Sequence, residues 1–288
     1  MKIRKQTSLA LALLGCSVVV SVFSTGAAAG LHDPVIIVGA DNNASDNPLV
    51  QPQDPAQAGS SRDQTMQFGD ILEGTNRDDL IVGRLGVDIL IGDDGNDVIV
   101  GGTEHFNPQN RDRAFGNRGS DVFLWAPGDG SDQFDGGKGI DAVVFGLIAE
   151  EENGDIVFRV SNNQQAGNIV LDPNTHLPVM DVTNSPGFCE IIDENSSPAA
   201  GEQLDALGLD HLLRFSLRAV RDAFESGTQD TDNGLRVTLH LKDVEVLVCA
   251  SRFGGEIEVY DLTVSPAVLI DTRELPRKLR KLLEKIVI

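Results

Sequence analysis

A nine-residue period over residues 65–144 constrains the fold more than any other feature of the chain. Within it, an Asp followed two positions later by an apolar or small residue recurs eight times, at spacings of 9, 9, 9, 15, 9, 11 and 9. The two odd spacings are one period plus an insertion of six or of two residues. The segment also holds 15 of the 30 glycines in the chain. Acids placed with a period indicate a structural repeat rather than a merely solvated acidic surface.

Each nonapeptide has room for a tight turn of six residues and a strand of three. Turns of this kind need positive φ, which favours Gly at position 1, 2 or 4. The apolar position is expected to point inward and to stack on its equivalents, because one unit alone buries almost nothing. The aligned acids are Asp70, Asp79, Asp88, Asp97, Asp112, Asp121, Asp132 and Asp141, and the apolar positions are Leu72, Ile81, Leu90, Ile99, Ala114, Phe123, Phe134 and Val143.

The units at 83–91 (GRLGVDILI), 92–100 (GDDGNDVIV) and 116–124 (GNRGSDVFL) resemble the RTX, or haemolysin-type, nonapeptide GGxGxDxUx. The resemblance implies a mainly β fold, with a right-handed parallel β-roll over 65–144 in which each unit stacks on the one two further along. It also implies several Ca²⁺ ions, held between turn carbonyls and the Asp side chains of such units. All eight aligned Asp residues are therefore candidate ligands, and the pairs Asp79 with Asp97 and Asp70 with Asp88 are the first to test.

Without a cation these carboxylates repel one another, and the small apolar burial does not offset the entropy of the chain. We therefore expect 65–144 to be largely disordered without Ca²⁺ and to fold on binding it, at about 10⁻⁴–10⁻³ M as in extracellular modules. Three departures weaken the pattern: Asp70 belongs to a degenerate first unit, Arg77 replaces a position-4 Gly, and the insertion 104–109 puts closure around Asp112 in doubt. Trp125 is expected to cap the apolar stack.

The first 29 residues read as a secretory signal peptide, with Lys2, Arg4 and Lys5 before an apolar run and an Ala-rich cleavage site. An alternative is a lipobox ending at Cys16, which would carry a lipid anchor. Either way we expect export to the medium, the cell surface or the periplasm. No later stretch is long enough to span a bilayer. Most RTX proteins instead use an uncleaved C-terminal export signal, so this leader is a departure from the family.

The flanks of the array differ in character. Residues 30–64 are polar and rich in Pro and Ser, which predicts a flexible linker or arm. Residues 145–288 predict a smaller α+β or β-rich domain, with a helix over 202–226 and a basic amphipathic helix at the C-terminus that either docks on the protein or serves a membrane surface or partner. Cys189 and Cys249 are either one disulfide or two buried thiols.

The formal charge is −21, and loss of the three positive charges in 1–29 takes it to −24. Such a chain will not seek nucleic acid and will attract cations. No H-E-x-x-H or G-x-S-x-G motif is present, and the five histidines lack metal-ligand spacing. The sequence therefore predicts a calcium-binding structural or adhesive protein with a cell-surface or polysaccharide partner. The alternative is a secreted hydrolase or lyase, acting on polysaccharide or lipid, that carries the same module.

Overall fold

The computed structural model describes residues 34–39, 69–84, 86–102, 111–158, 168–228 and 237–287. The protein is mainly β, with 42% strand and 16% helix. Several predicted features lie outside the described residues: the signal sequence predicted for residues 1–29 with Cys16, most of the arm predicted for 30–64, the start of the first unit, and the insertion 104–109. Within the ranges given above, no helix combines the length and the apolar character that crossing a membrane requires.

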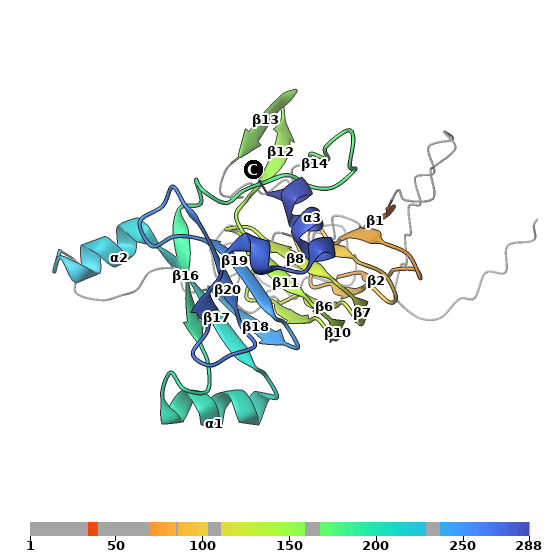
Figure 1. Ribbon diagram of the computed structural model, residues 1–288. Coiled ribbons are helices and arrows are strands. Elements are labelled where there is room, and N and C mark those ends of the chain that lie inside the picture. The colour runs from red at the N-terminus through yellow and green to blue at the C-terminus, as the bar shows by residue number, and fades with distance from the viewer. Residues whose placement is uncertain are drawn as a thin grey trace, which may run out of the picture.

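Successive nonapeptides alternate between two parallel sheets, so each unit pairs with the unit two away (Figure 1). No sheet among the described residues closes on itself. A pair of two-residue strands, β7 (Arg118–Gly119) and β10 (Lys138–Gly139), continues the pairing into the turns. The first sheet holds β3 (Asp79–Val82), β5 (Val98–Val100), β8 (Val122–Trp125) and β11 (Ala142–Phe145), and the second holds β2 (Ile71–Glu73), β4 (Ile89–Ile91), β6 (Arg113–Phe115) and β9 (Gln133–Asp135).

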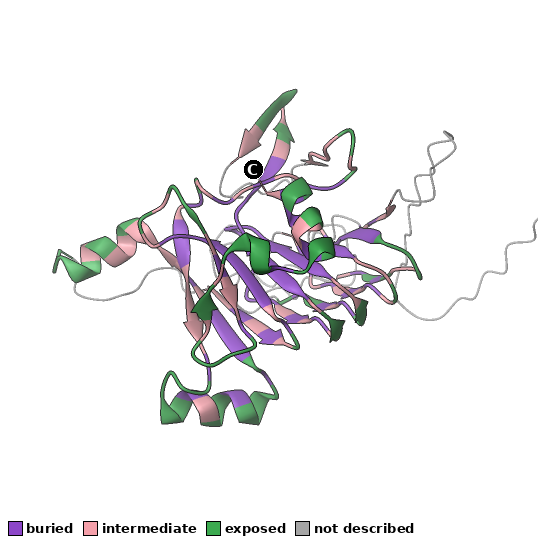
Figure 2. Cartoon of the chain, viewed as in Figure 1, coloured by how far each residue is buried: buried purple, intermediate pink, exposed green. Residues whose placement is uncertain are grey.

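The two sheets share one apolar core, and the apolar position of every unit lies in it. All eight of these side chains are 2% exposed or less, which confirms the inward stack expected from the period (Figure 2). The rings of Phe123 and Phe134 stack across the core, with centroids 5.4 Å apart. Trp125 is buried against Phe145 and Phe215 and donates from Nε1 to the carbonyl oxygen of Gly130. It is therefore buried in the core, and the stack continues past its strand to β11.

The outer face of the first sheet is also buried, because the C-terminal helix covers it. This helix, α3 (Arg277–Ile286), follows a short 3₁₀ turn η2 (Thr272–Glu274) and lies over the sheet (Figure 1). Its side chains Leu279, Leu283 and Ile286 pack against the sheet. The docking interpretation of the basic helix is therefore correct for its apolar side. On its polar side, Lys278, Lys281 and Lys285 line a groove of about 510 Å³.

The prediction of a flexible arm over 30–64 is wrong for its first part. Residues 35–38 form β1 (Val35–Val38), which pairs in parallel with β3 at the N-terminal edge of the first sheet. Gly39 then donates to the carbonyl oxygen of Val82 at 2.8 Å, as the turn glycines of the array do. The polar composition of the whole segment concealed this short apolar run, which continues the stack by one strand.

The C-terminal region is β-rich and extends both sheets rather than standing apart. A small antiparallel sheet holds β12 (Leu147–Glu152), β13 (Asp155–Phe158), β14 (Asn168–Ile169) and β15 (Met180–Asp181). The second sheet of the array continues into β18 (Val237–Lys242), β17 (His211–Leu217) and β16 (Gly187–Ile192). The first sheet continues into β19 (Val246–Ala250), β20 (Ile257–Asp261) and β21 (Val268–Leu269).

The helix expected over 202–226 is wrong, because two helices flank a strand there. The first helix, α1 (Pro198–Leu207), ends at Gly208, whose φ of 64° is left-handed. Strand β17 follows, and α2 (Arg218–Glu225) comes after it. In β17, Leu212 packs toward α1, whereas Leu213 and Phe215 enter the core between the sheets. Leucines on both faces of a strand mimicked the spacing of a helix.

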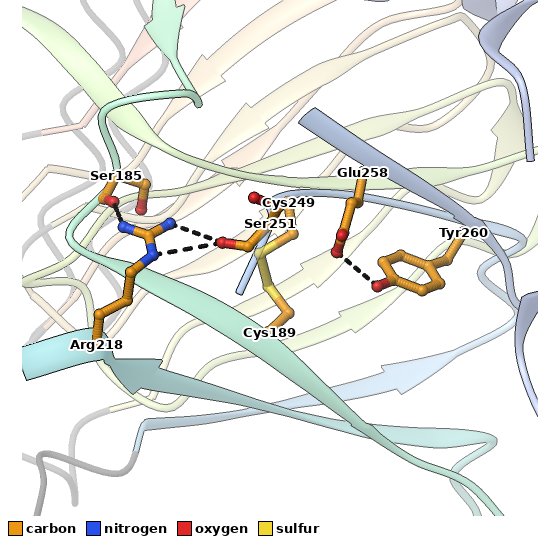
Figure 3. Close-up of a disulfide and its surroundings, with 7 residues drawn as sticks. All are labelled: Ser185, Cys189, Arg218, Cys249, Ser251, Glu258 and Tyr260. Carbon is orange, nitrogen blue, oxygen red and sulfur yellow. Dashed lines mark hydrogen bonds between the residues drawn. A yellow bond between two sulfur atoms is a disulfide. The ribbon is translucent and has the colours of Figure 1, made fainter. Parts of the chain in front are cut away.

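A disulfide between Cys189 of β16 and Cys249 of β19 joins the two extended sheets (Figure 3). Beside it, the Arg218 guanidinium donates to the carbonyl oxygens of Ser185, Ser251 and Arg252. The crosslink spans 60 residues of sequence, so it constrains a long loop of the unfolded chain.

Replacing both Cys189 and Cys249 with Ser is expected to lower the free energy of unfolding by about 2–4 kcal/mol, because the unfolded chain regains the freedom of that loop. The measurement is urea unfolding at saturating Ca²⁺. Reductant should destabilise the wild type and leave the double variant unchanged. A reductant effect of equal size on both would contradict the assignment.

Candidate metal centre

The aligned aspartates form two ladders that run along the turns. In each ladder, Oδ1 of one Asp accepts the backbone N–H of the aligned Asp two units earlier, at 2.6 to 3.0 Å. All eight side chains are 7% exposed or less. The structure therefore brings together both pairs singled out from the sequence. One ladder runs Asp79, Asp97, Asp121 and Asp141, and the other runs Asp70, Asp88, Asp112 and Asp132.

The insertion at 104–109 does not break the ladder. The N–H of Asp88 donates to Oδ1 of Asp112 at 2.7 Å, across a separation of 24 residues. On the other side, the N–H of Asp97 donates to Oδ1 of Asp121 at 2.8 Å, also across 24 residues. The doubt about Asp112 is therefore resolved in favour of regular stacking, with the extra residues leaving the register intact.

The second carboxylate oxygen sets most ladder members apart from ordinary buried acids. Within the described part of the chain, Oδ2 of Asp88, Asp97, Asp121, Asp132 and Asp141 is buried without a hydrogen-bond partner. Burying a carboxylate without a compensating partner is costly. Burial raises the pKa of Asp97 and Asp141 to about 8, and neighbouring ladder carboxylates add to the shift. Burial likewise raises the pKa of Asp88, Asp121 and Asp132 to about 7.

The first acid of one ladder is different. Oδ2 of Asp79 accepts from the backbone N–H of Thr75 at 2.5 Å and from its hydroxyl at 3.0 Å. Burial still raises the pKa of Asp79, but these bonds oppose the shift. Arg77 also belongs to this end, where no nonapeptide lies two units earlier. Its side chain is exposed, whereas a Cβ on the equivalent Gly95 would clash with the carbonyl oxygen of Arg77.

Glycine is required at position 1 because the carbonyl oxygen of the turn two units away lies too close for a side chain. It is not required there for a positive φ. A Cβ on Gly116 would lie 2.6 Å from the carbonyl oxygen of Gly136 and would press on Oδ2 of Asp121. A Cβ on Gly92 would meet the carbonyl oxygen of Gly116 and Oδ2 of Asp97 in the same way. Each such glycine leaves a cradle bordered by a carboxylate oxygen and a carbonyl oxygen. Positive φ occurs at position 2, where Arg84, Asp93 and Asn117 adopt it without being glycine. It also occurs at position 4, where Gly86, Gly119 and Gly139 adopt it.

Gly116→Ala is therefore expected to destabilise the protein by about 1–3 kcal/mol, because neither backbone nor carboxylate can move aside without breaking the stack. Gly201→Ala is the matched control. Gly201 lies in α1, where the new Cβ would meet its nearest atom at 3.2 Å and alanine favours the helix. Thermal unfolding of both variants checks the difference, and equal melting temperatures would contradict this role for the cradle.

The donor set fits a hard cation. Carboxylate and carbonyl oxygens are the ligands that Ca²⁺ prefers, and it takes six to eight of them. Among the described residues, no three His, Cys, Asp or Glu side chains gather into a metal-binding group. A calcium ion on a ladder would be held by carboxylates of stacked units together with turn carbonyl oxygens.

The two-residue insertion before Asp132 buries one more acid. Oδ2 of Asp129 accepts the backbone N–H of Ala126 at 2.8 Å. Burial raises the pKa of Asp129 well above its usual range, and Asp132 is among the carboxylates that add to the shift. The turn thus places one more buried carboxyl group beside the end of one ladder.

Sequence reasoning missed Glu245, which accepts the backbone N–H of Asp141 through Oε2 at 2.7 Å. The alternation of Val244, Val246 and Val248 marks a strand but does not reveal that this acid meets the array. His211, one of the five histidines, begins β17 and is 6% exposed. Burial lowers its pKa.

Comparison of the chain with protein-family models, with curated proteins and with solved structures finds no match.

Proposed function

We propose that this chain is an exported RTX-like calcium-binding protein with a structural or adhesive role, in which residues 65–144 bind several Ca²⁺ ions. The observation that carries the proposal is the pair of Asp ladders. In them, buried Oδ2 atoms without hydrogen-bond partners face the carbonyl oxygens of turns two units away. Buried carboxylates are normally paired with a cation or neutralised, and a divalent ion bound by two stacked carboxylates would compensate the ladder.

The proposal includes the parallel β-roll of that family. Its support is the alternation of units between two parallel sheets, the pairing of each unit with the one two away, and the single apolar core between the sheets. The turns hold the carboxylates of such sites in place and keep space beside them. The Oδ1 bond to the preceding N–H fixes each carboxylate, and the position-1 glycine keeps the space beside Oδ2 clear of side chains.

Export belongs to the same proposal. Its sequence support is the leader in 1–29, and its structural support is the disulfide between Cys189 and Cys249, since such bonds persist in oxidising compartments. Extracellular calcium near millimolar would suit sites of about 10⁻⁴–10⁻³ M, so the array would fold outside the cytosol.

Calorimetric Ca²⁺ titration of residues 30–288, with Mg²⁺ in a parallel run, tests the proposal. The wild type is expected to bind several Ca²⁺ ions and to gain β signal in circular dichroism. Asp97→Asn removes one ladder charge and should weaken binding about tenfold or more, because calcium affinity follows the ligand charge count. Asp94→Asn is the matched control, since Asp94 lies in the same turn but is exposed and paired with Arg118 at 3.3 Å. Absence of calcium binding by the wild type would overturn the proposal.

A further inference from the structure

The stacks of the array do not end with the last nonapeptide. Strand β18 pairs in parallel with β9 and places Leu241 opposite Phe134. Strand β19 pairs in parallel with β11 and places Leu247 opposite Val143. Phe134 and Val143 are the apolar positions of the last two units, and both leucines lie fully buried in the same core. Residues 237–250 therefore extend the stack by two more strands, which we call rungs, although they carry no nonapeptide motif.

The backbone bonds of the array continue into these rungs. Gly136 donates to the carbonyl oxygen of Lys242 at 2.9 Å, as Gly116 donates to that of Asp135 at 2.9 Å. Val246 donates to the carbonyl oxygen of Asp141 at 3.0 Å, repeating the bond from Ala142 to Asp121. The turn from β18 to β19 thus takes the place that the next repeat turn would occupy.

Glu245 completes the ladder in this turn. Its Oε2 accepts the N–H of Asp141 at 2.7 Å. In the same way, Oδ1 of Asp141 accepts the N–H of Asp121 at 2.7 Å. Only residues 243–245 connect β18 to β19, whereas 136–141 form the corresponding repeat turn. The extra methylene of Glu over Asp lets the carboxylate reach the ladder position from the shorter turn.

The cradle at Gly136 has the same borders as those within the array. A Cβ there would lie 2.7 Å from Oδ2 of Asp141 and would press on the carbonyl oxygen of Asp243. Asp141 is fully buried, and its Oδ2 has no hydrogen-bond partner among the described residues. The Asp243 carboxylate lies 3.3 Å from Nζ of Lys242, which also contacts Asp135 at 2.8 Å. The carbonyl oxygen of Asp243 is the atom of this residue that borders the cradle.

We propose that Asp141, Glu245 and the carbonyl oxygen of Asp243 form a terminal calcium site shared between the array and the C-terminal region. This inference rests on the proposed calcium-binding function. Because the ligands come from both sides of the junction, the ion would hold β18 and β19 on the array. Calcium binding would then couple folding of the repeats to docking of the residues that follow them.

The test compares Glu245→Gln with the wild type and with Glu256→Gln, an exposed acid with the same charge change, in residues 30–288. Calorimetry should show one Ca²⁺ fewer, or one site about tenfold weaker, in Glu245→Gln and no change in Glu256→Gln. Trp125 gives a second measurement. It is the only tryptophan and packs on Phe215 of β17 at the junction, so its fluorescence transition should move to about tenfold higher Ca²⁺ in Glu245→Gln.

Unchanged stoichiometry, affinity and fluorescence transition in Glu245→Gln would overturn the terminal site, while Ca²⁺ binding by the wild type would leave the proposed function standing. No calcium binding by the wild type would instead overturn both. If Glu245→Gln fails to fold at saturating Ca²⁺, Glu245→Asp replaces it. The shorter acid keeps the charge but withdraws the oxygen, so weaker calcium binding supports the site and wild-type binding overturns it.

Discussion

Chelating calcium at about pH 8 is expected to unfold the array, whereas chelation at about pH 5 is expected to leave it folded. The reason is that the buried ladder acids have raised pKa values in the folded state. Burial raises the pKa of Asp97 and Asp141 from 3.8 to about 8 and that of Asp88, Asp121 and Asp132 to about 7. At the lower pH a proton can neutralise each carboxylate, and at the higher pH only a cation can.

The direction in which stability changes with pH follows from proton linkage. A carboxyl group whose pKa is higher in the folded state binds more protons there than in the unfolded chain, so stability falls as pH rises through that interval. For the ladder the interval runs from 3.8 to about 8. Acids with a lowered pKa, such as Asp172 with its backbone hydrogen bonds from Thr175 and Asn174, lose their contribution only as pH falls below 3.8. They do not affect the comparison.

Melting temperature against pH, with chelator and with about 10 mM Ca²⁺, checks this expectation. With chelator the temperature should fall steadily from about pH 5 to about pH 8, and calcium should remove most of that fall. Asp97→Asn with Asp121→Asn should flatten the chelated curve, because two of the titrating groups are gone. A chelated protein that becomes more stable toward pH 8 would contradict the explanation.

The period predicted the aligned acids and the inner stack, because a nine-residue repeat fixes which positions share a face. The pairing of acids two units apart followed from the resemblance to the RTX nonapeptide. Sequence reasoning misplaced the role of position-1 glycine, since close approach between turns depends on the stacking distance and not on local φ. It also missed that β1 extends the stack at one end and that β18 and β19 form two further rungs at the other. None of these strands carries the motif, and all are recruited by exposed strand edges at the ends of the stack.

Glu245 shows why part of the site could not be predicted. In sequence it is one acid among many on an alternating strand, 104 residues from Asp141. Its meeting with the ladder depends on the parallel pairing of β19 with β11, which only the assembled sheets specify. The helix expected over 202–226 failed for a related reason, because the pairing of β17 between β16 and β18 overrode its local periodicity.

Phe134→Ala is expected to cost about 3–5 kcal/mol of unfolding free energy, the range for deleting a buried aromatic side chain. Phe134 is fully buried, and its ring stacks on that of Phe123 across the core. One neighbour along the stack is Ala114, which has no side chain long enough to move into the vacated space, and the other is Leu241.

Phe253→Ala is the matched control, because Phe253 is 92% exposed and its loss should change stability by less than about 0.5 kcal/mol. Urea unfolding of both variants at saturating Ca²⁺ gives the comparison. Since the stack and the ladder lie in the same units, Phe134→Ala should also raise the Ca²⁺ concentration needed for folding, although it touches no carboxylate oxygen. A destabilised variant that folds at the wild-type calcium concentration would mean that the apolar core and the turns fold independently.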